Sequence, residues 1–215
     1  MEDVVIIGAG GFGREVKMLI DQINAKSLQF NLLGFYDDVV QESSDVFGSK
    51  VLGSIDKLNY VTEPTSVCIA IGAPKIKKQI IEKLTNPMLS FPRLIHPSVA
   101  LGIAVEEIGK GTIICAGTII TVNITIGEFV ILNLGCTVGH DTVIGNNCAF
   151  MPQSNIAGEV VLGEAVYGGM GVGIINQVSV GNNVTLGAGS VVVKNIPSNC
   201  LAVGIPAKVI KEYEG

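Results

Sequence analysis

His140 is the first candidate for chemistry, because it is one of only two histidines in the 215 residues and Asp141 follows it directly. Imidazole changes its charge near neutral pH, and an adjacent carboxylate favours the protonated ring and so raises its basicity. An exposed histidine in this setting can act as a general base. The alternative is a surface histidine without a role. The other histidine, His96, is expected to be structural.

A second candidate lies near the start of the chain, where glycines follow a short apolar run. Residues 3–8 predict a buried parallel strand, Gly8-Ala9-Gly10-Gly11-Phe12-Gly13 a turn, and residues 14–23 an amphipathic helix. Glycines let the backbone approach a pyrophosphate, and the helix N-terminus carries partial positive charge. The alternative is a turn whose glycines serve only the packing of the helix on the strand.

Two more strands are predicted, over residues 32–36 and 67–71, and residues 75–84 predict a helix. Asp37 and Asp38 follow the first of these strands and Gly72 follows the second. Strands that alternate with helices indicate a small Rossmann-like α/β domain, in which an acid at the end of the second strand usually binds a ribose. The unit is about half of a dinucleotide-binding domain, so a mononucleotide ligand suits it better than NAD.

Fifteen six-residue units then run without insertion from Ile108 to Pro197. The first position is apolar in every unit except the one that begins with Gly168, and the fifth position is small or β-branched. Pairs such as Ile126-Gly127 and Ile144-Gly145 recur every eighteen residues, so three short strands form each coil. This period predicts a parallel β-helix with His140 at a corner. A β-sandwich would need a period of two.

The corners of such a coil need residues that tolerate left-handed backbone, which Asn146-Asn147 and Asn182-Asn183 supply. The glycine-rich residues 168–173 either admit a ligand closely or relieve crowding inside the coil.

The two patterns predict an α/β plus all-β chain with one domain over residues 1–92 and a second over 93–215. The junction falls within residues 87–97, where Pro87, Pro92 and Pro97 interrupt regular structure.

Composition narrows the functional classes. The net charge of −5 argues against nucleic acid as a partner. The chain starts with the acidic stretch Met1-Glu2-Asp3, which predicts no signal peptide. No apolar run approaches the ~18 residues of a membrane span, so no membrane insertion is expected and the protein is predicted to be cytoplasmic.

The five cysteines form no CxxC pair, and Cys136 and Cys148 fall on inward positions, as expected of buried thiols. One histidine in the repeat is too few for a familiar three-ligand catalytic zinc site, so no metal is expected.

Together these features resemble the PglD/NeuD-type sugar acetyltransferases over nearly the whole chain. The residues that carry the resemblance are the glycine turn, Asp37-Asp38, Ile95-His96-Pro97-Ser98, the hexapeptide array, His140 and Gly204-Ile205-Pro206-Ala207-Lys208. The resemblance implies that the β-helix is left-handed and that the protein is a homotrimer. It also implies acetyl-CoA as co-substrate and a nucleotide-linked amino sugar as acceptor.

The resemblance assigns roles to residues. The base falls on His140, its acid on Asp141, and a residue of the acceptor region on Asn133. Nucleotide-sugar contacts fall on Gly10, Gly11, Phe12, Asp37, Asp38 and Gly72. Acetyl-CoA contacts fall on Ala149, Gly158, Met170, Ala188, Pro206, Ala207 and Lys208. Some family members place a second histidine near the acetyl group, nine residues after the base, where this chain has Ala149.

The function expected from these features is N-acetylation of an amino sugar carried on a nucleotide, for bacterial surface-glycan biosynthesis. An O-acetyltransferase acting on sialic acid or another sugar hydroxyl is one alternative. A scaffolding β-helix with a vestigial nucleotide unit is another, against which the His140-Asp141 pair argues.

Overall fold

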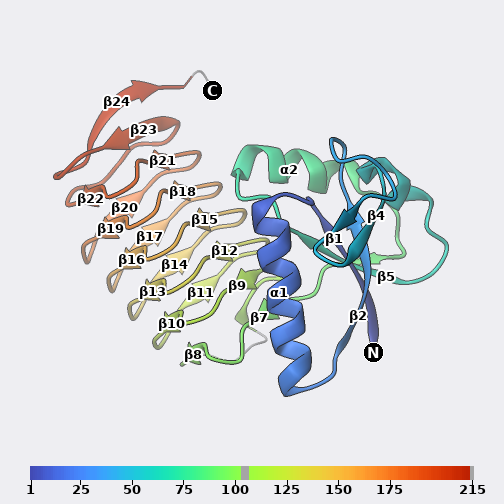
Figure 1. The fold of residues 1–215 in the computed structure, drawn as a ribbon. Helices are drawn as coiled ribbons and strands as arrows, with labels where there is room; N and C mark the ends of the chain where they lie inside the picture. The colour runs from blue at the N-terminus through green and yellow to red at the C-terminus, as the bar shows by residue number, and fades with distance from the viewer. Residues whose placement is uncertain (103–106, 214–215) are drawn as a thin grey trace. The chain divides into compact units, whose positions relative to one another are not determined.

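The computed structural model describes residues 1–102 and 107–213 (Figure 1). The chain forms two compact units, Met1–Pro97 and Ser98–Gly215. The sequence places the boundary slightly earlier, between residues 92 and 93.

The first unit is a mostly parallel sheet with helices. Its elements are β1 (Glu2–Ile7), α1 (Gly11–Lys26), β2 (Phe30–Tyr36), β3 (Asp45–Val46), β4 (Ser49–Gly53), the 3-10 helix η1 (Ile55–Tyr60), β5 (Thr65–Ile69), α2 (Pro74–Lys83), β6 (Leu89–Ser90) and β7 (Leu94–Ile95). The strand order is β3-β4-β2-β1-β5-β6, and all pairs are parallel except β3 with β4. The central strand β1 is buried from Val4 to Ile7, as its apolar sequence predicts.

The parallel order brings together the residues singled out in this unit. Strand β1 lies between β2 and β5, so their carboxyl ends share one edge of the sheet. The glycine turn, the acids after β2 and the loop through Gly72 all leave this edge. Such an edge is where α/β sheets bind ligands.

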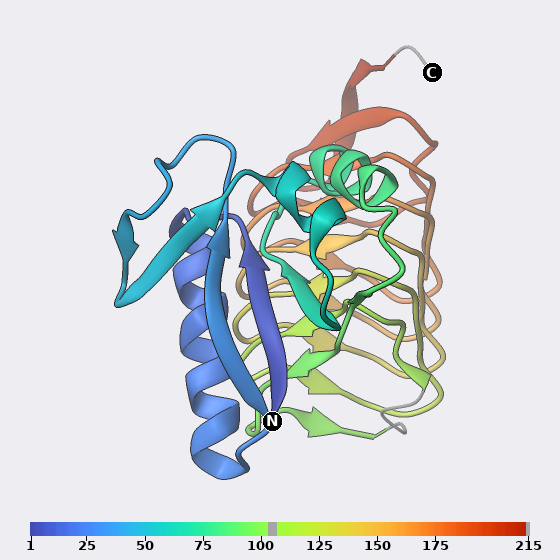
Figure 2. The same cartoon turned by 90° about the vertical axis from the view of Figure 1, so that its right-hand side faces the viewer.

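The second unit is a left-handed parallel β-helix whose coils stack on one another (Figure 2). Its short strands form three sheets, one on each face. The first face contains β8 (Ala100–Leu101), β10 (Ile119–Ile120), β13 (Thr137–Val138), β16 (Asn155–Ile156), β19 (Gly173–Ile174) and β22 (Val191–Val192). The second contains β11 (Thr125–Ile126), β14 (Val143–Ile144), β17 (Val161–Leu162) and β20 (Ser179–Val180). The third contains β7, β9 (Ile113–Ile114), β12 (Ile131–Leu132), β15 (Ala149–Phe150), β18 (Tyr167–Gly168), β21 (Thr185–Leu186), β23 (Cys200–Val203) and the antiparallel β24 (Lys208–Glu212).

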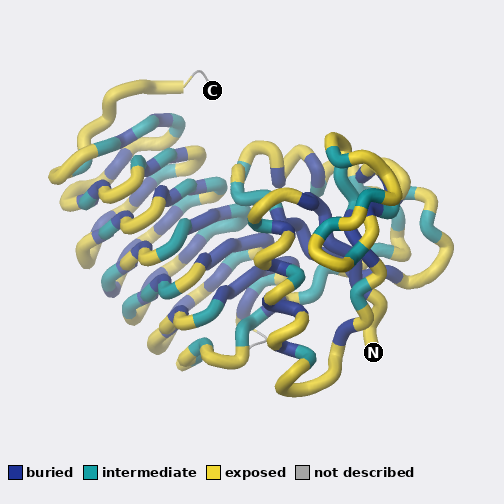
Figure 3. The backbone as a smooth tube through the Cα atoms, viewed as in Figure 1, coloured by how far each residue is buried: buried dark blue, intermediate teal, exposed yellow. Residues whose placement is uncertain are grey.

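The inward positions predicted from the six-residue period are confirmed. The first and fifth residues are buried in all fifteen units, and the buried segments alternate with exposed corners along every coil (Figure 3). Cys136 and Cys148 belong to this core and are fully buried, as predicted.

The corners share one backbone conformation. The fourth residue adopts left-handed backbone in each of the first fourteen units, with φ between 54° and 73°. Asn147 and Asn183 are among these residues, as expected, and so is Asp141, with φ of 58°. The N–H of a corner residue donates to a carbonyl of the preceding coil, as Glu159 does to His140 at 2.7 Å. These bonds fix each residue beside the one eighteen positions earlier.

Gly168 breaks the apolar rule because of its neighbour in the preceding coil. It pairs with Phe150, the one aromatic residue at a first position. A Cβ atom on Gly168 would lie 2.4 Å from Cδ1 of the Phe150 ring. The glycine therefore provides the volume that the ring occupies, which favours relief of crowding over ligand approach at this position.

Gly168→Ala should lower the free energy of unfolding by about 1–3 kcal/mol through overpacking against the ring. Phe150→Leu in the same chain should recover part of this loss, because the two positions share one volume. Urea unfolding of the single and double variants at a fixed protein concentration measures the coupling. Strictly additive losses would contradict the shared volume.

Candidate active site

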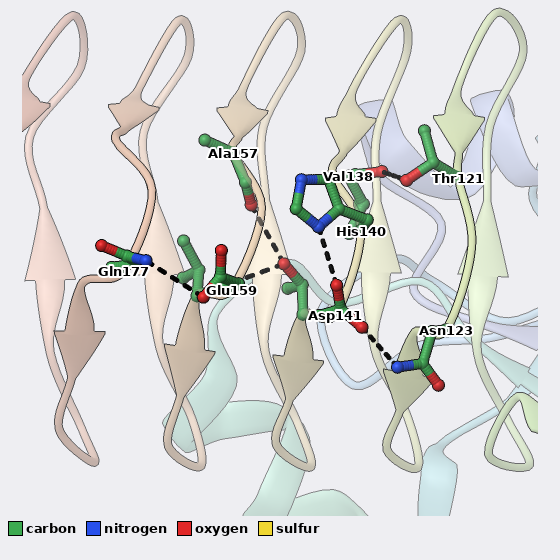
Figure 4. A network of polar contacts seen from close by, with 10 residues as sticks. Thr121, Asn123, Val138, His140, Asp141, Ala157, Glu159 and Gln177 are labelled. Atoms are coloured by element: carbon green, nitrogen blue, oxygen red, sulfur yellow. Dashed lines mark hydrogen bonds and ion pairs between the residues drawn. The ribbon is translucent and has the colours of Figure 1, made fainter.

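His140 and Asp141 lie at the corner between the first and second faces, which we call the first corner: residues 121–124, 139–142, 157–160 and 175–178 in successive coils (Figure 4). The short strand β13 enters this corner and β14 leaves it. The third and fourth residues of a unit form the turn itself, so the side chains at 140 and 141 point away from the core. Their exposed fractions are 57% and 48%.

The two side chains form a hydrogen-bonded pair. Nδ1 of His140 lies 2.8 Å from Oδ2 of Asp141. The other carboxylate oxygen, Oδ1, accepts a hydrogen bond from Nδ2 of Asn123 in the preceding coil. These two bonds, that of Asn123 first, lower the pKa of Asp141. An ionised carboxylate only accepts, so Nδ1 carries the proton and Nε2 of the neutral ring can take one from a substrate.

Gly158 occupies the position beside His140 in the next coil. A Cβ atom there would lie 2.6 Å from Nε2 and 2.7 Å from Cε1 of the imidazole. The ring can lie against this coil only because residue 158 has no side chain. Among the described residues, the Gly158 N–H donates none of the backbone hydrogen bonds between coils, so it can donate to an oxygen near Nε2. The first corner therefore brings together a ring nitrogen that can act as a base and a backbone N–H that can donate to an oxygen.

Asn133 lies at the other end of β13 from His140, beside the corner that joins the third and first faces. It is 5% exposed, and its Oδ1 accepts a hydrogen bond from the Leu134 N–H at 2.7 Å. Among the described residues, no hydrogen bond joins it to the His140-Asp141 pair; the two sites border the same face.

The residues predicted to contact acetyl-CoA are spread around the first face, with one exception. Met170, which is 61% exposed, and Ala188 lie at the corner that leads into β19 and β22. The turn with Pro206, Ala207 and Lys208 lies against β22, because the Ala207 N–H donates to the Val191 carbonyl at 2.8 Å. Ala149 is the exception, since it is fully buried on β15 of the third face.

In the first unit, the glycines of the turn fall into two groups. Gly8 has φ of +97°, and a Cβ on Gly13 would lie 1.8 Å from the Gly8 carbonyl oxygen. The packing alternative therefore accounts for both. It does not account for Gly10 and Gly11, where a Cβ would meet nothing within 4 Å. Their missing side chains leave the start of α1 open.

The start of α1 favours an anion. Its N-cap Gly10 makes no side-chain capping bond, and its first turn holds no acidic residue. The first N–H groups of a helix lack partners inside the helix and carry partial positive charge. Phe12 lies in this first turn and is half-buried.

Asp37 and Asp38 both hold the backbone at the carboxyl edge. Asp37 accepts hydrogen bonds from the N–H groups of Ala9 (2.7 Å), Val39 (2.8 Å) and Val40 (2.9 Å). Burial raises the pKa of Asp37, but these three bonds outweigh it and the pKa is lowered. Asp38 accepts one bond, from the Ile55 N–H at 2.9 Å, and so keeps more capacity for a ligand than Asp37.

The described residues give little support to thiol or metal chemistry. Burial raises the pKa of the Cys136 thiol to about 11, so it is not a thiolate at neutral pH. Across residues 1–102 and 107–213, no three His, Cys, Asp or Glu side chains are grouped to hold a metal ion. No helix in that part of the chain is long and apolar enough to cross a membrane.

A left-handed β-helix with an exposed His-Asp pair, preceded by a Rossmann-like unit, defines a hexapeptide-repeat acyltransferase. The family model of the PglD N-terminal domain matches residues 3–84. GDP-perosamine N-acetyltransferase of Escherichia coli O157:H7 is 31% identical, over 96% of this chain and 95% of the relative. The chain therefore belongs to the PglD/NeuD-type sugar acetyltransferases.

Solved structures agree. PerB from Caulobacter crescentus, in complex with CoA and GDP-perosamine, is 31% identical with a TM-score of 0.85, and the match covers 98% of each chain. The acetyltransferase domain of PglB from Neisseria gonorrhoeae, in complex with acetyl coenzyme A, is 30% identical with a TM-score of 0.85, over 97% of this chain and 99% of that one. The predictions of an acetyltransferase and of the fold class are confirmed.

Gly158→Ala should leave the fold intact and remove most of the activity. The exposed imidazole can rotate away from the new methyl group at little cost in stability, but a displaced base costs on the order of 10²-fold in kcat. Thiol release from acetyl-CoA measures kcat, and urea unfolding checks the fold. Adding His140→Ala to this variant should cause little further loss. A normal kcat for Gly158→Ala would show that the ring position seen here is not the active one.

Proposed function

We propose that this chain transfers the acetyl group of acetyl-CoA to the amine of an amino sugar carried on a nucleoside diphosphate, for the synthesis of a bacterial surface glycan. The observation that carries the proposal is the first corner, where Nε2 of His140 lies against the Gly158 backbone and Asp141 holds Nδ1. Two full-length matches support the proposal. One is a GDP-perosamine N-acetyltransferase, and the other is a solved structure in complex with CoA and GDP-perosamine.

The reaction is a direct transfer. The neutral amine attacks the thioester carbonyl carbon, a C–N bond forms, and Nε2 of His140 takes the proton that the nitrogen loses. The Gly158 N–H donates to the oxygen that becomes negative. The C–S bond then breaks, and the proton on His140 passes to the departing sulfur. Asp141 stabilises the imidazolium between the two proton transfers.

Acetyl-CoA is placed along the first face, from Gly158 toward Met170, Ala188 and the turn of residues 206–208. The exposed ammonium of Lys208 is suited to a phosphate of the co-substrate. Within the glycine-rich run, a Cβ on Gly171 would meet nothing within 4 Å. The left-handed backbone of Gly171, with φ of +70°, is one reason for glycine here, and the open surroundings leave room for the pantetheine arm.

The nucleotide is placed at the carboxyl edge of the first unit. Gly10, Gly11 and Phe12 offer backbone N–H groups at the start of α1 to the diphosphate. Asp38 offers its second carboxylate oxygen to a ribose hydroxyl, and Gly72 lies on the neighbouring loop. Asp37 supports the turn through its bond to the Ala9 N–H rather than through a contact of its own.

We also propose a cytoplasmic homotrimer. On the second face, Val143 and Val161 pair directly and are 42% and 49% exposed, so this flat face has apolar surface for a neighbouring subunit to cover. The face begins at the first corner, so a neighbouring subunit there would border His140. Light scattering at micromolar concentration tests the assembly, and a monomer would overturn it.

An O-acetyltransferase would use the same corner, but the full-length relative whose name states its reaction acetylates nitrogen. A scaffold would need neither the His140-Asp141 pair nor the space at Gly158 that admits the ring.

His140→Ala should lower kcat by at least ~10²-fold with little change in acetyl-CoA affinity, because a general base acts in the transition state. GDP-perosamine is the first acceptor to test, followed by UDP- and dTDP-linked amino sugars. Thiol release gives kcat, and calorimetry gives the affinity. Near-normal turnover at saturating acceptor would place the base elsewhere.

Gly10→Val should weaken nucleotide-sugar binding by roughly tenfold or more, about 1.4 kcal/mol, and leave acetyl-CoA binding unchanged. The backbone of Gly10 is extended and its surroundings are open, so valine fits the fold and blocks only a ligand. Gly13→Ala is the contrasting control: it should lower the unfolding midpoint instead, because its Cβ meets backbone. Equal nucleotide-sugar affinity of wild type and Gly10→Val would contradict the placement.

A further inference from the structure

We infer that Asn123 is a positioning residue for the transfer reaction: it holds the Asp141 carboxylate in the orientation that keeps the His140 ring aligned. The inference rests on the proposed function, since it concerns the same general base. Asn123 lies one coil before the pair, at the same corner position as Asp141.

The geometry is a relay of two hydrogen bonds (Figure 4). Nδ2 of Asn123 donates to Oδ1 of Asp141, and Oδ2 of the same carboxylate bonds Nδ1 of His140. One bond on each oxygen fixes the carboxylate plane, whereas an exposed carboxylate with a single partner can turn toward water. Gly158 then supports the opposite side of the ring. The imidazole is held between the coil that contains Asn123 and the coil that contains Gly158.

The backbone of the corner does not depend on the Asn123 amide. The Asp141 N–H donates to the Val122 carbonyl at 3.2 Å, as equivalent residues do in the other coils. The amide-carboxylate bond itself is exposed, and such bonds contribute little to stability. Loss of the amide should therefore affect the orientation of the pair more than the fold.

A second pair on the same corner provides a matched comparison. Nε2 of Gln177 donates to Oε2 of Glu159 at 3.1 Å, again between corner positions of adjacent coils. Gln177 and Asn123 have the same backbone, with φ of 61° and 57°. The difference is that no histidine precedes Glu159. Apart from the pair itself, Glu159 is the charged residue within the ranges that define the first corner, and Lys194 lies in the next turn along, after β22.

The test removes each amide by a substitution that the left-handed backbone tolerates: Asn123→Gly and, as control, Gln177→Gly. Asn123→Gly should lower kcat by about tenfold at unchanged KM for acetyl-CoA. Gln177→Gly should change neither. Asn123→Gln, which keeps an amide donor, should restore most of the activity.

A double-mutant cycle tests whether Asn123 acts through the Asp141 carboxylate. Asn123→Gly should cause little further loss of kcat in an Asp141→Asn background, because the amide acts through that carboxylate. Wild-type kcat for Asn123→Gly, equal losses in the Gln177→Gly control, or full additivity with Asp141→Asn would each overturn the inference. His140→Ala separates the two proposals: if it retains turnover the proposed function fails, whereas if it is inactive while Asn123→Gly is normal only the positioning role fails.

Discussion

The hydrogen bonds between successive coils are the constraint on which the site depends. Strands pair eighteen residues apart, as Thr137 does with Asn155, and the corner N–H groups donate to the coil before. The surroundings of any side chain are thus set by the residues eighteen positions away in each direction. For His140 these are Val122 and the side-chain-free Gly158, and for Asp141 they are Asn123 and Glu159. The chemistry of the corner follows from this register.

The backbone conformation of the corner also determines where an acidic residue is tolerated. Left-handed backbone costs a residue other than glycine on the order of 1 kcal/mol, and aspartate and asparagine tolerate it best. The position after His140 is such a corner, and Asp141 occupies it with φ of 58°. A side chain there leaves the coil beside the ring rather than entering the core. The fold thus accepts the carboxylate at the position where it can hold Nδ1.

Local pattern predicts the β-helix well because its six-residue period is visible in the sequence itself. The inward positions, the corner asparagines and the exposed His140-Asp141 pair could all be predicted. Effects that act across coils are harder to predict, although the register carries them. The sequence leaves open whether Gly168 relieves crowding until it is paired with Phe150, and nothing local to Asn123 indicates its bond to Asp141. The first unit was less predictable. Strands β3 and β6 have two residues each, and β4 has only two apolar side chains, Val51 and Leu52, so their pairing depends on the sheet they join. Gly8 and Gly10 are the same residue type, and only the backbone around them distinguishes packing from an open site.

The missing second histidine places more of the reaction on the first corner. The position nine residues after the base holds Ala149, a fully buried residue on the third face, which has no polar side chain to offer the acetyl group. In the proposed reaction the Gly158 N–H is then the donor to the acetyl oxygen. The same glycine makes room for the imidazole, since a Cβ on it would lie 2.6 Å from Nε2. Two requirements of acyl transfer, an aligned base and an oxyanion donor, thus depend on one residue that has no side chain.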